Sequence, residues 1–267
     1  MEKILSYSFD KKTPLIISGP CVVESKDLCL KVAEQMKKIC NKHQLPYIFK
    51  ASYEKANRTS GSSFRSIGID ESLRILEEVK KEIGVPVLSD VHESVQVDAV
   101  KNVIDVIQIP AFLCRQTELL EAAGRSGLPV NIKKGQFMAP ADMKYAVDKV
   151  KKASGNTVLL TERGSFFGYG NLVVDYRSIP IMEEFAPVIF DVTHSVQLPG
   201  AGDGKSSGNR KMAPVLAKAA AAIGVSGFFI ETHPDPDQAL SDGPNMIPLH
   251  EMDAFIAMLV KLSNVFE

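Results

Sequence analysis

The sequence lacks the features that would divide the chain, anchor it in a membrane or staple it with disulfides. Its 267 residues contain no Pro/Gly/Ser-rich linker, no low-complexity tract and no block of like charges. Its apolar runs stay well below the roughly 18 residues that a membrane span needs, and its first residues show no signal-peptide pattern. We therefore expect a single catalytic domain over residues 1–267, in a cytoplasmic protein without a membrane partner.

Cysteine and net charge are also scarce. The four cysteines lie at positions 21, 29, 40 and 114, without Cys-x-x-Cys spacing, so we expect reduced thiols rather than a disulfide framework. Lys and Arg number 31 against 32 for Asp and Glu, which gives a formal net charge of −1 and argues against a nucleic-acid partner. Any anion-binding site must therefore be local.

What the sequence does contain is a regular alternation of short apolar runs and helical patterns. Eight short apolar runs recur, and most of them are continuously apolar, as in strands buried on both faces of a parallel sheet. They are 15–17, 47–49, 85–88, 106–109, 130–132, 158–160, 188–190 and 228–230. Between them lie helical patterns, the clearest being a helix capped by Ser25 with apolar residues up to Ile39. Further helices are expected around 73–79, 119–123, 141–150, 212–223 and 249–262, with a short one at best in 94–103.

This alternation over one undivided chain predicts an α/β fold, a closed (β/α)8 TIM barrel. The residues ahead of Leu15 fall outside the repeat. We expect residues from Ile4 to Lys12 to form a small hairpin that plugs the N-terminal mouth of the barrel.

In the stretch from Phe49 to Ser60, polar and charged residues follow directly after the second predicted strand. Lys50, Lys55 and Arg58 place three cations close together, and short donors between them suit phosphate oxygens or sugar hydroxyls. A solvated basic loop would look similar. Its position at the carboxyl end of a strand, where α/β enzymes place their working residues, favours an anion site.

The other predicted strands also end in reactive side chains. These ends carry Cys21, Asp90, His92, Glu93, Gln108, Lys133, Lys134, Glu162, Arg163, Asp191, His194, Glu231 and His233. A barrel brings all such ends to one face, which favours a catalytic site there. The cations Lys50, Lys55, Arg58, Arg115, Lys133 and Arg163 exceed what one phosphate needs. They suit substrates that bring two phosphates and a carboxylate.

A second group of side chains, Cys21, His194, Glu231 and Asp242, suits a divalent metal. A thiolate, an imidazole and two carboxylates favour zinc or iron(II) over magnesium. The alternatives are a small buried thiol at Cys21 and a hydrogen-bonded histidine at His194, with His233 as a rival ligand. The glycine-rich loop 197–208 is interpreted as a mobile lid rather than a P-loop, and the loop 232–245 returns Asp242 to the mouth.

Several motifs together carry a family resemblance. They are Gly-Pro-Cys-Val-Val-Glu-Ser (19–25), Lys-Ala-Asn-Arg-Thr-Ser (55–60), Ile-Pro-Ala-Phe-Leu-Cys-Arg-Gln-Thr (109–117), Asn-Ile-Lys-Lys-Gly-Gln-Phe (131–137), Phe-Gly-Tyr-Gly-Asn-Leu-Val-Val-Asp (167–175) and Asp-Val-Thr-His-Ser-Val-Gln (191–197). The chain resembles the 3-deoxy-D-manno-octulosonate 8-phosphate synthases from about residue 15 to the end. The resemblance implies a (β/α)8 barrel, usually a homotetramer, that condenses phosphoenolpyruvate with arabinose 5-phosphate in lipopolysaccharide biosynthesis.

The resemblance also implies roles for single residues. Phosphoenolpyruvate would be held by Lys50, Lys55, Gln108, Lys133 and Arg163, and the sugar phosphate by Asn57, Arg58 and Thr59, with Arg115 reaching in from a neighbouring subunit. Lys55, Lys133, His194 and Asp90 would be catalytic, Asp90 toward a sugar hydroxyl or the attacking water. Cys21 implies the metal-dependent class, with zinc or iron(II) bound by Cys21, His194, Glu231 and Asp242 and with manganese or cobalt as substitutes.

One departure and three alternatives accompany this resemblance. The loop Ser241-Asp242-Gly243-Pro244 mixes the patterns of the metal-dependent and metal-independent classes. A 3-deoxy-arabino-heptulosonate 7-phosphate synthase is one alternative, although such enzymes typically show Lys-Pro-Arg where this chain has Lys-Ala-Asn-Arg. A Schiff-base aldolase with Lys133 as nucleophile is the second, and a non-catalytic sugar-phosphate sensor is the third.

Overall fold

The computed structural model describes residues 1–56, 64–154, 157–202 and 205–264. Within these ranges, eight parallel strands close into a ring, because β11 pairs with β8 on one side and with β14 on the other. They are β3 (Leu15–Gly19), β4 (Tyr47–Lys50), β5 (Val87–Asp90), β6 (Val106–Ile109), β7 (Val130–Lys133), β8 (Val158–Glu162), β11 (Val188–Asp191) and β14 (Gly227–His233). All eight predicted strands and the TIM barrel are confirmed. A two-residue strand, β15 (Ile247–Pro248), pairs with the end of β14.

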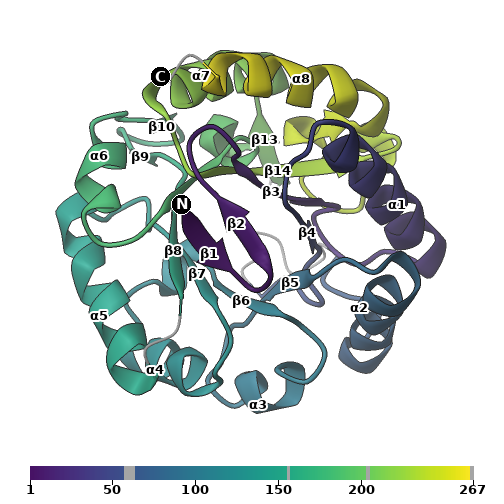
Figure 1. The fold of residues 1–267 in the computed structure, drawn as a ribbon, viewed down its shortest axis with the longest axis horizontal. Helices are drawn as coiled ribbons and strands as arrows, with labels where there is room; N and C mark the ends of the chain where they lie inside the picture. Colours follow the sequence, from purple (N-terminus) through teal and green to yellow (C-terminus); the bar gives the residue numbers. More distant parts are fainter. Residues whose placement is uncertain (57–63, 155–156, 203–204, 265–267) are drawn as a thin grey trace.

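Helices surround this ring (Figure 1). They are α1 (Lys26–Lys42), α2 (Ile69–Ile83), α3 (Gln96–Val100), α4 (Thr117–Arg125), α5 (Met143–Ser154), α6 (Ser178–Glu183), α7 (Ala213–Ile223) and α8 (Met252–Ser263). Short 3-10 turns occupy Ala111–Leu113, Pro140–Asp142, His194–Val196, Arg210–Met212, Pro236–Gln238, Gly243–Asn245 and Leu249–Glu251. The Ser25 cap is confirmed, since its side chain accepts a hydrogen bond from the Leu28 N–H. No helix of the described residues is long and apolar enough to cross a membrane.

The hairpin at the start of the chain closes the N-terminal end of the barrel, as predicted. Its strands β1 (Glu2–Ile4) and β2 (Tyr7–Phe9) pair antiparallel and lie across the middle of the ring in Figure 1. Ile4 and Phe9 are buried in one cluster with barrel residues such as Leu15, Ile17 and Phe229. The hairpin therefore supplies the apolar side chains that complete this end of the barrel interior.

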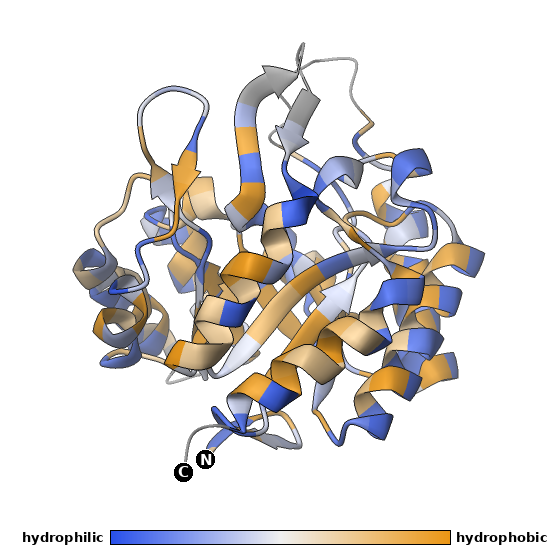
Figure 2. Ribbon diagram, turned by 90° about the horizontal axis from the view of Figure 1, so that it is seen from above, coloured by the Kyte–Doolittle hydropathy of each residue, from blue (hydrophilic) through white to orange (hydrophobic). Residues whose placement is uncertain are grey.

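Two further hairpins follow β8 and β11. One joins β9 (Ser165–Phe166) to β10 (Leu172–Val173), and the other joins β12 (Gln197–Gly202) to β13 (Lys205–Gly208). Figure 2 shows the second hairpin at the top, at the opposite end from the N-terminus. The segment interpreted as a mobile lid thus contains paired strands, and its motion stays a prediction.

Candidate active site

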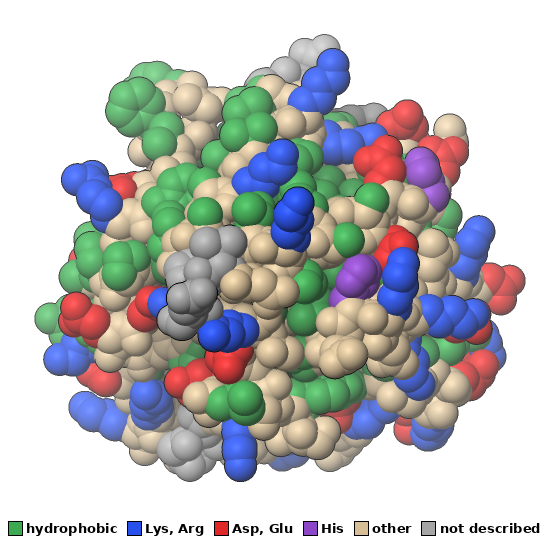
Figure 3. All heavy atoms as spheres, turned by 45° about the horizontal axis from the view of Figure 1, so that its top comes forward, with side chains coloured by type: hydrophobic (Ala, Val, Ile, Leu, Met, Phe, Trp, Pro, Cys, Tyr) green, Lys and Arg blue, Asp and Glu red, His purple; other side chains and the backbone are tan. Residues whose placement is uncertain are grey.

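A cavity of about 200 Å³ opens at the carboxyl ends of the barrel strands. Of the predicted site residues it brings together Lys50, Lys55, Asp90, Gln108, Lys133, Arg163, His194 and Asp242. Arg115 is exposed and does not line this cavity. Asn57, Arg58 and Thr59 lie outside the described residues. Figure 3 shows cationic and acidic side chains interspersed on the face drawn, whereas the cavity gathers Lys and Arg at one place.

Arg163 is the clearest anion-binding group in the cavity. Its side chain is buried, and its Nη2 donates to the Gln197 Oε1 at 2.7 Å. Its Nε and Nη1 have no hydrogen-bond partner among the described residues. Burial lowers the pKa of this guanidinium, although nearby carboxylates including Asp191 oppose the shift. A buried cation with free donors is costly without an anion, so the site is suited to a phosphate or carboxylate.

Lys133, at the end of the neighbouring strand β7, is held by a carboxylate and an aromatic ring. Its Nζ lies 2.5 Å from the Asp191 Oδ2 and 3.5 Å from the centre of the Phe229 ring. Burial lowers the pKa of Lys133, while Asp191 opposes that shift. Asp191 is fully buried and also contacts the Nδ1 of His194 at 2.9 Å. Burial disfavours the ionised carboxyl of Asp191, but His194 and Lys133 outweigh it and hold its pKa well below the usual range.

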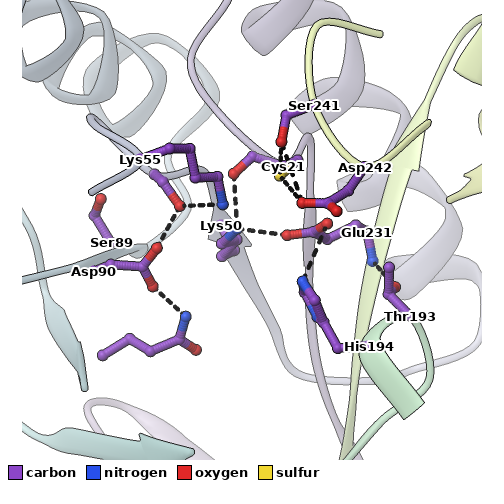
Figure 4. A network of polar contacts seen from close by, with 12 residues as sticks. Cys21, Lys50, Lys55, Ser89, Asp90, Thr193, His194, Glu231, Ser241 and Asp242 are labelled. Carbon is purple, nitrogen blue, oxygen red and sulfur yellow. Dashed lines mark hydrogen bonds and ion pairs between the residues drawn. The ribbon is translucent and has the colours of Figure 1, made fainter. Parts of the chain in front are cut away.

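Lys50 and Lys55 make two neighbouring sets of polar contacts, of which that of Lys55 reaches Asp90 (Figure 4). The Lys50 Nζ donates to the Glu231 Oε1 at 2.6 Å and to the Cys21 carbonyl oxygen at 2.8 Å. Lys55 donates to the Ser52 hydroxyl at 2.9 Å, and Ser52 in turn donates to Asp90. Lys50 therefore neutralises a predicted metal ligand as well as lining the cavity, a pairing that the sequence did not reveal.

The other face of Asp90 completes this network. Gln108 donates to the carboxylate through its Nε2, so both oxygens of Asp90 have partners. Burial alone would raise the pKa of Asp90, yet Lys50 and Lys55 outweigh it and place that pKa well below its usual range. Asp90 is thus a fixed carboxylate with no proton to give.

Three of the four predicted metal ligands come together at the rim of the barrel. One possible ligand atom from each of Cys21, Glu231 and Asp242 lies within 4.8 Å of the others. The Cys21 Sγ is 3.0 Å from the Ser241 hydroxyl and 3.1 Å from the Asp242 Oδ2. Burial, followed by the charge of Glu231, raises the pKa of the Cys21 thiol. A bound cation would reverse this effect, because metals bind the thiolate.

The fourth predicted ligand, His194, lies beside this cluster. Its Nε2 is 3.7 Å from the Glu231 Oε2, a buried oxygen that has no hydrogen-bond partner among the described residues. An orphaned carboxylate oxygen facing an imidazole nitrogen fits a shared divalent ion, and the thiolate, imidazole and carboxylate set favours zinc or iron(II). The rival ligand His233 instead places its Nε2 3.7 Å from Glu24, away from the cluster.

Some cavity residues were not assigned roles from sequence. Gln136 and Phe166 line the cavity from the β7 and β8 loops, and Gln197 contributes from the expected lid. Asp191 accepts a hydrogen bond from Lys133, and Ser52 accepts one from Lys55. Of these five residues, only Asp191 could have been found from the sequence, because it directly follows an apolar run at a predicted strand end.

The sequence is similar to known proteins over most of its length. The model of the DAHP synthetase I family matches residues 8–267. A protein of Synechococcus sp. is 53% identical over 258 residues, which cover 96% of this chain and 91% of that protein. A protein of Paraburkholderia xenovorans is 55% identical over 254 residues, 92% of this chain and 89% of its own length. A protein of Xylella fastidiosa is 54% identical over 265 residues, 98% of this chain and 96% of its own length.

All three relatives carry the name 2-dehydro-3-deoxyphosphooctonate aldolase, another name for 3-deoxy-D-manno-octulosonate 8-phosphate synthase. The resemblance drawn from the motifs is thereby confirmed. The chain belongs to the DAHP synthetase I family and, within it, to the 3-deoxy-D-manno-octulosonate 8-phosphate synthases.

Proposed function

We propose that this chain condenses phosphoenolpyruvate with D-arabinose 5-phosphate and water. The products are 3-deoxy-D-manno-octulosonate 8-phosphate, an intermediate of lipopolysaccharide biosynthesis, and inorganic phosphate. The observation that carries the proposal is the buried Arg163 guanidinium, which shares a cavity with Lys133 and Lys55 and has two donors without a partner in the described parts of the chain. The names of the relatives point to the same reaction.

A coupled phosphate-release assay tests this reaction. Phosphate should appear only when both substrates are present, and arabinose 5-phosphate should be strongly preferred over erythrose 4-phosphate. The reverse preference would identify a heptulosonate synthase. Irreversible labelling of Lys133 by borohydride with substrate would identify a Schiff-base aldolase, and binding without turnover would identify a sensor.

Phosphoenolpyruvate should lie at the buried end of the cavity, held by Lys50, Lys55, Gln108, Lys133 and Arg163. Its C3 would attack the aldehyde carbon of the sugar, water would add at C2, and phosphate would then leave from C2. The cations stabilise the phosphate and carboxylate while positive charge develops at C2, and Asp90 is placed to orient the water or a sugar hydroxyl. Oxygen-labelled phosphoenolpyruvate tests the route, since the bridging oxygen should leave with phosphate rather than stay in the sugar.

Cys21, His194, Glu231 and Asp242 would hold a divalent ion, zinc or iron(II), with manganese or cobalt as substitutes. When bound, such an ion would orient the sugar aldehyde and polarise it or a water molecule. Chelation should abolish turnover, and added metal should restore it. Cys21→Asn should keep measurable activity that no longer responds to chelator. Full turnover of the unaltered protein, verified metal-free by elemental analysis, would refute the metal assignment.

Arg115 is exposed and does not line the cavity of its own chain, so the sugar-phosphate role that the family resemblance implies for it requires a neighbouring subunit. We propose a homotetramer in which Arg115 serves a neighbour's sugar phosphate, together with Asn57, Arg58 and Thr59 of that neighbour. Mixed oligomers of Arg115→Ala and Lys133→Ala proteins should recover some activity through hybrid sites. No recovery in verified mixed oligomers would contradict a shared site. A cytoplasmic location stays a prediction.

A further inference from the structure

We propose that Asp191 is a positioning residue that joins the two halves of the site, since one carboxylate orients both Lys133 and His194. The inference rests on the proposed function, in which Lys133 binds phosphoenolpyruvate and His194 binds the metal. It gives Asp191 a role although the side chain does not line the cavity.

Both oxygens of Asp191 are in use. The Oδ2 accepts from the Lys133 Nζ at 2.5 Å and lies 2.9 Å from the His194 Nδ1. The Oδ1 accepts from the His194 backbone N–H at 2.8 Å and lies 3.1 Å from the same Nδ1. Asp191 ends β11 and is 0% exposed, so water does not compete for these contacts.

The contacts determine which nitrogen of His194 carries the proton. An ionised carboxylate can only accept, so the Nδ1 that faces it must be a donor. Lys133 also approaches the same Nδ1, to 3.4 Å, and its ammonium alone would favour a lone pair there, but the two carboxylate contacts at 2.9 and 3.1 Å are shorter and require the proton. In the neutral ring the Nε2 then presents its lone pair toward Glu231, as metal binding requires.

The same contacts determine the place of the Lys133 ammonium. Asp191 holds the Nζ over the Phe229 ring, and His194 lies beside it. Without the carboxylate, Lys133 and the His194 Nδ1–H would be two donors facing each other with no acceptor between them. One or both would have to move, so a single substitution should disturb both binding functions.

A purely structural role for Asp191 predicts something different. In that case Asp191 only neutralises a buried lysine. Its loss would lower the melting temperature, but the folded protein would bind Zn²⁺ and phosphoenolpyruvate with unchanged affinity. Direct binding measurements separate the two roles. Zn²⁺ affinity can be measured by competition with a chromophoric chelator, and phosphoenolpyruvate affinity by calorimetry on metal-free proteins.

Three variants give a diagnostic pattern. Asp191→Asn should weaken Zn²⁺ binding by about 10- to 100-fold, the usual effect of losing a carboxylate that supports a metal-binding histidine. It should also weaken phosphoenolpyruvate binding by about tenfold or more. Lys133→Met should weaken only phosphoenolpyruvate binding, and His194→Gln only Zn²⁺ binding. The matched single-function variants show that the two losses in Asp191→Asn do not follow from each other.

The inference is overturned if Asp191→Asn leaves either affinity within about twofold of the unaltered protein. If Asp191→Asn does not fold, nitrogen-15 NMR of the unaltered, Zn²⁺-loaded protein decides instead, with His194 assigned by the loss of its signals in His194→Gln. A proton on the Nδ1 supports the inference, and a proton on the Nε2 overturns it. An unaltered protein that binds neither Zn²⁺ nor phosphoenolpyruvate would overturn the proposed function as well.

Discussion

Replacement of Lys134 by methionine should destabilise the protein strongly, although Lys134 does not line the cavity. Lys134 and Glu162 are each 1% exposed, and their Nζ and Oε1 atoms lie 3.7 Å apart. Lys134 also donates to the Ser165 hydroxyl at 3.0 Å and to the Gly164 carbonyl oxygen at 3.2 Å. Lys134→Met keeps an unbranched side chain, one atom shorter, but leaves the Glu162 carboxylate buried without this cation.

Removing one partner of a buried ion pair typically costs about 3–5 kcal/mol. Glu162 keeps its hydrogen bonds from the Gly164 N–H at 2.6 Å and from the Ser178 hydroxyl at 2.7 Å, which favours the lower part of that range. For a chain of this size each kcal/mol shifts the melting temperature by about 2–4 °C, so a cost of about 3–4 kcal/mol should lower it by about 6–16 °C. Thermal unfolding followed by circular dichroism measures it.

Two matched variants test the reasoning. Lys144→Met replaces an exposed lysine on α5 and should change stability by no more than about 0.5 kcal/mol. The double variant Lys134→Met/Glu162→Gln removes both charges and should recover part of the loss. If Lys134→Met melts within about 2 °C of the unaltered protein, less than 1 kcal/mol is involved, and the electrostatic argument for this pair is refuted.

Three other predictions follow from single side chains. Phe9→Ala should cost about 3–5 kcal/mol in urea unfolding, because Phe9 is fully buried, with KM values unchanged in the folded enzyme. Gly19→Ala should lower kcat/KM by about 10²-fold, because a methyl group there would overlap the Lys50 carbonyl oxygen and displace that strand end; unchanged kinetics would contradict it. Asp90→Asn should lower stability at pH 7, and the deficit should shrink in urea titrations as the pH falls below about 4. Lys50 and Lys55 hold the pKa of Asp90 in the folded protein below its value of about 3.9 in the unfolded chain. The ionised carboxylate therefore stabilises the fold above that pH, and this contribution is lost as the pH falls.

The barrel was predictable because its strands are buried on both faces, so that most of them contain a short, continuously apolar run. Helix α6 was not predicted, since six residues that include Pro180 are too few to show a helical period. The β9–β10 and β12–β13 hairpins were missed for a related reason. Their strands are two to six residues long, partly glycine-rich, and do not alternate between apolar and polar residues.

The site was predictable only in part. The type of each residue and its position at a strand end can be seen in the local sequence, whereas the contacts between side chains from different strands cannot. The end positions of Lys50, Lys133 and Glu231 follow from the strand pattern. Lys50 and Glu231 form an ion pair at 2.6 Å although they are 181 residues apart in sequence. The strands that carry them come together only when the ring closes. The same holds for Asp191, whose partner Lys133 is 58 residues away.

The N-terminal hairpin also affects how the protein can be handled. Trimming the chain to the repeating part of the barrel would remove Ile4 and Phe9 and leave Leu15 and Ile17 at an uncovered apolar end. Such a shortened protein should be prone to aggregation, even with every residue of the cavity intact. Attachment to a solid support through the intact first residues, by contrast, would leave the end with the β12–β13 hairpin free, which lies opposite the N-terminus in Figure 2. The cavity opens at that end, lined by residues such as Lys50, Arg163 and Gln197, and would face solution.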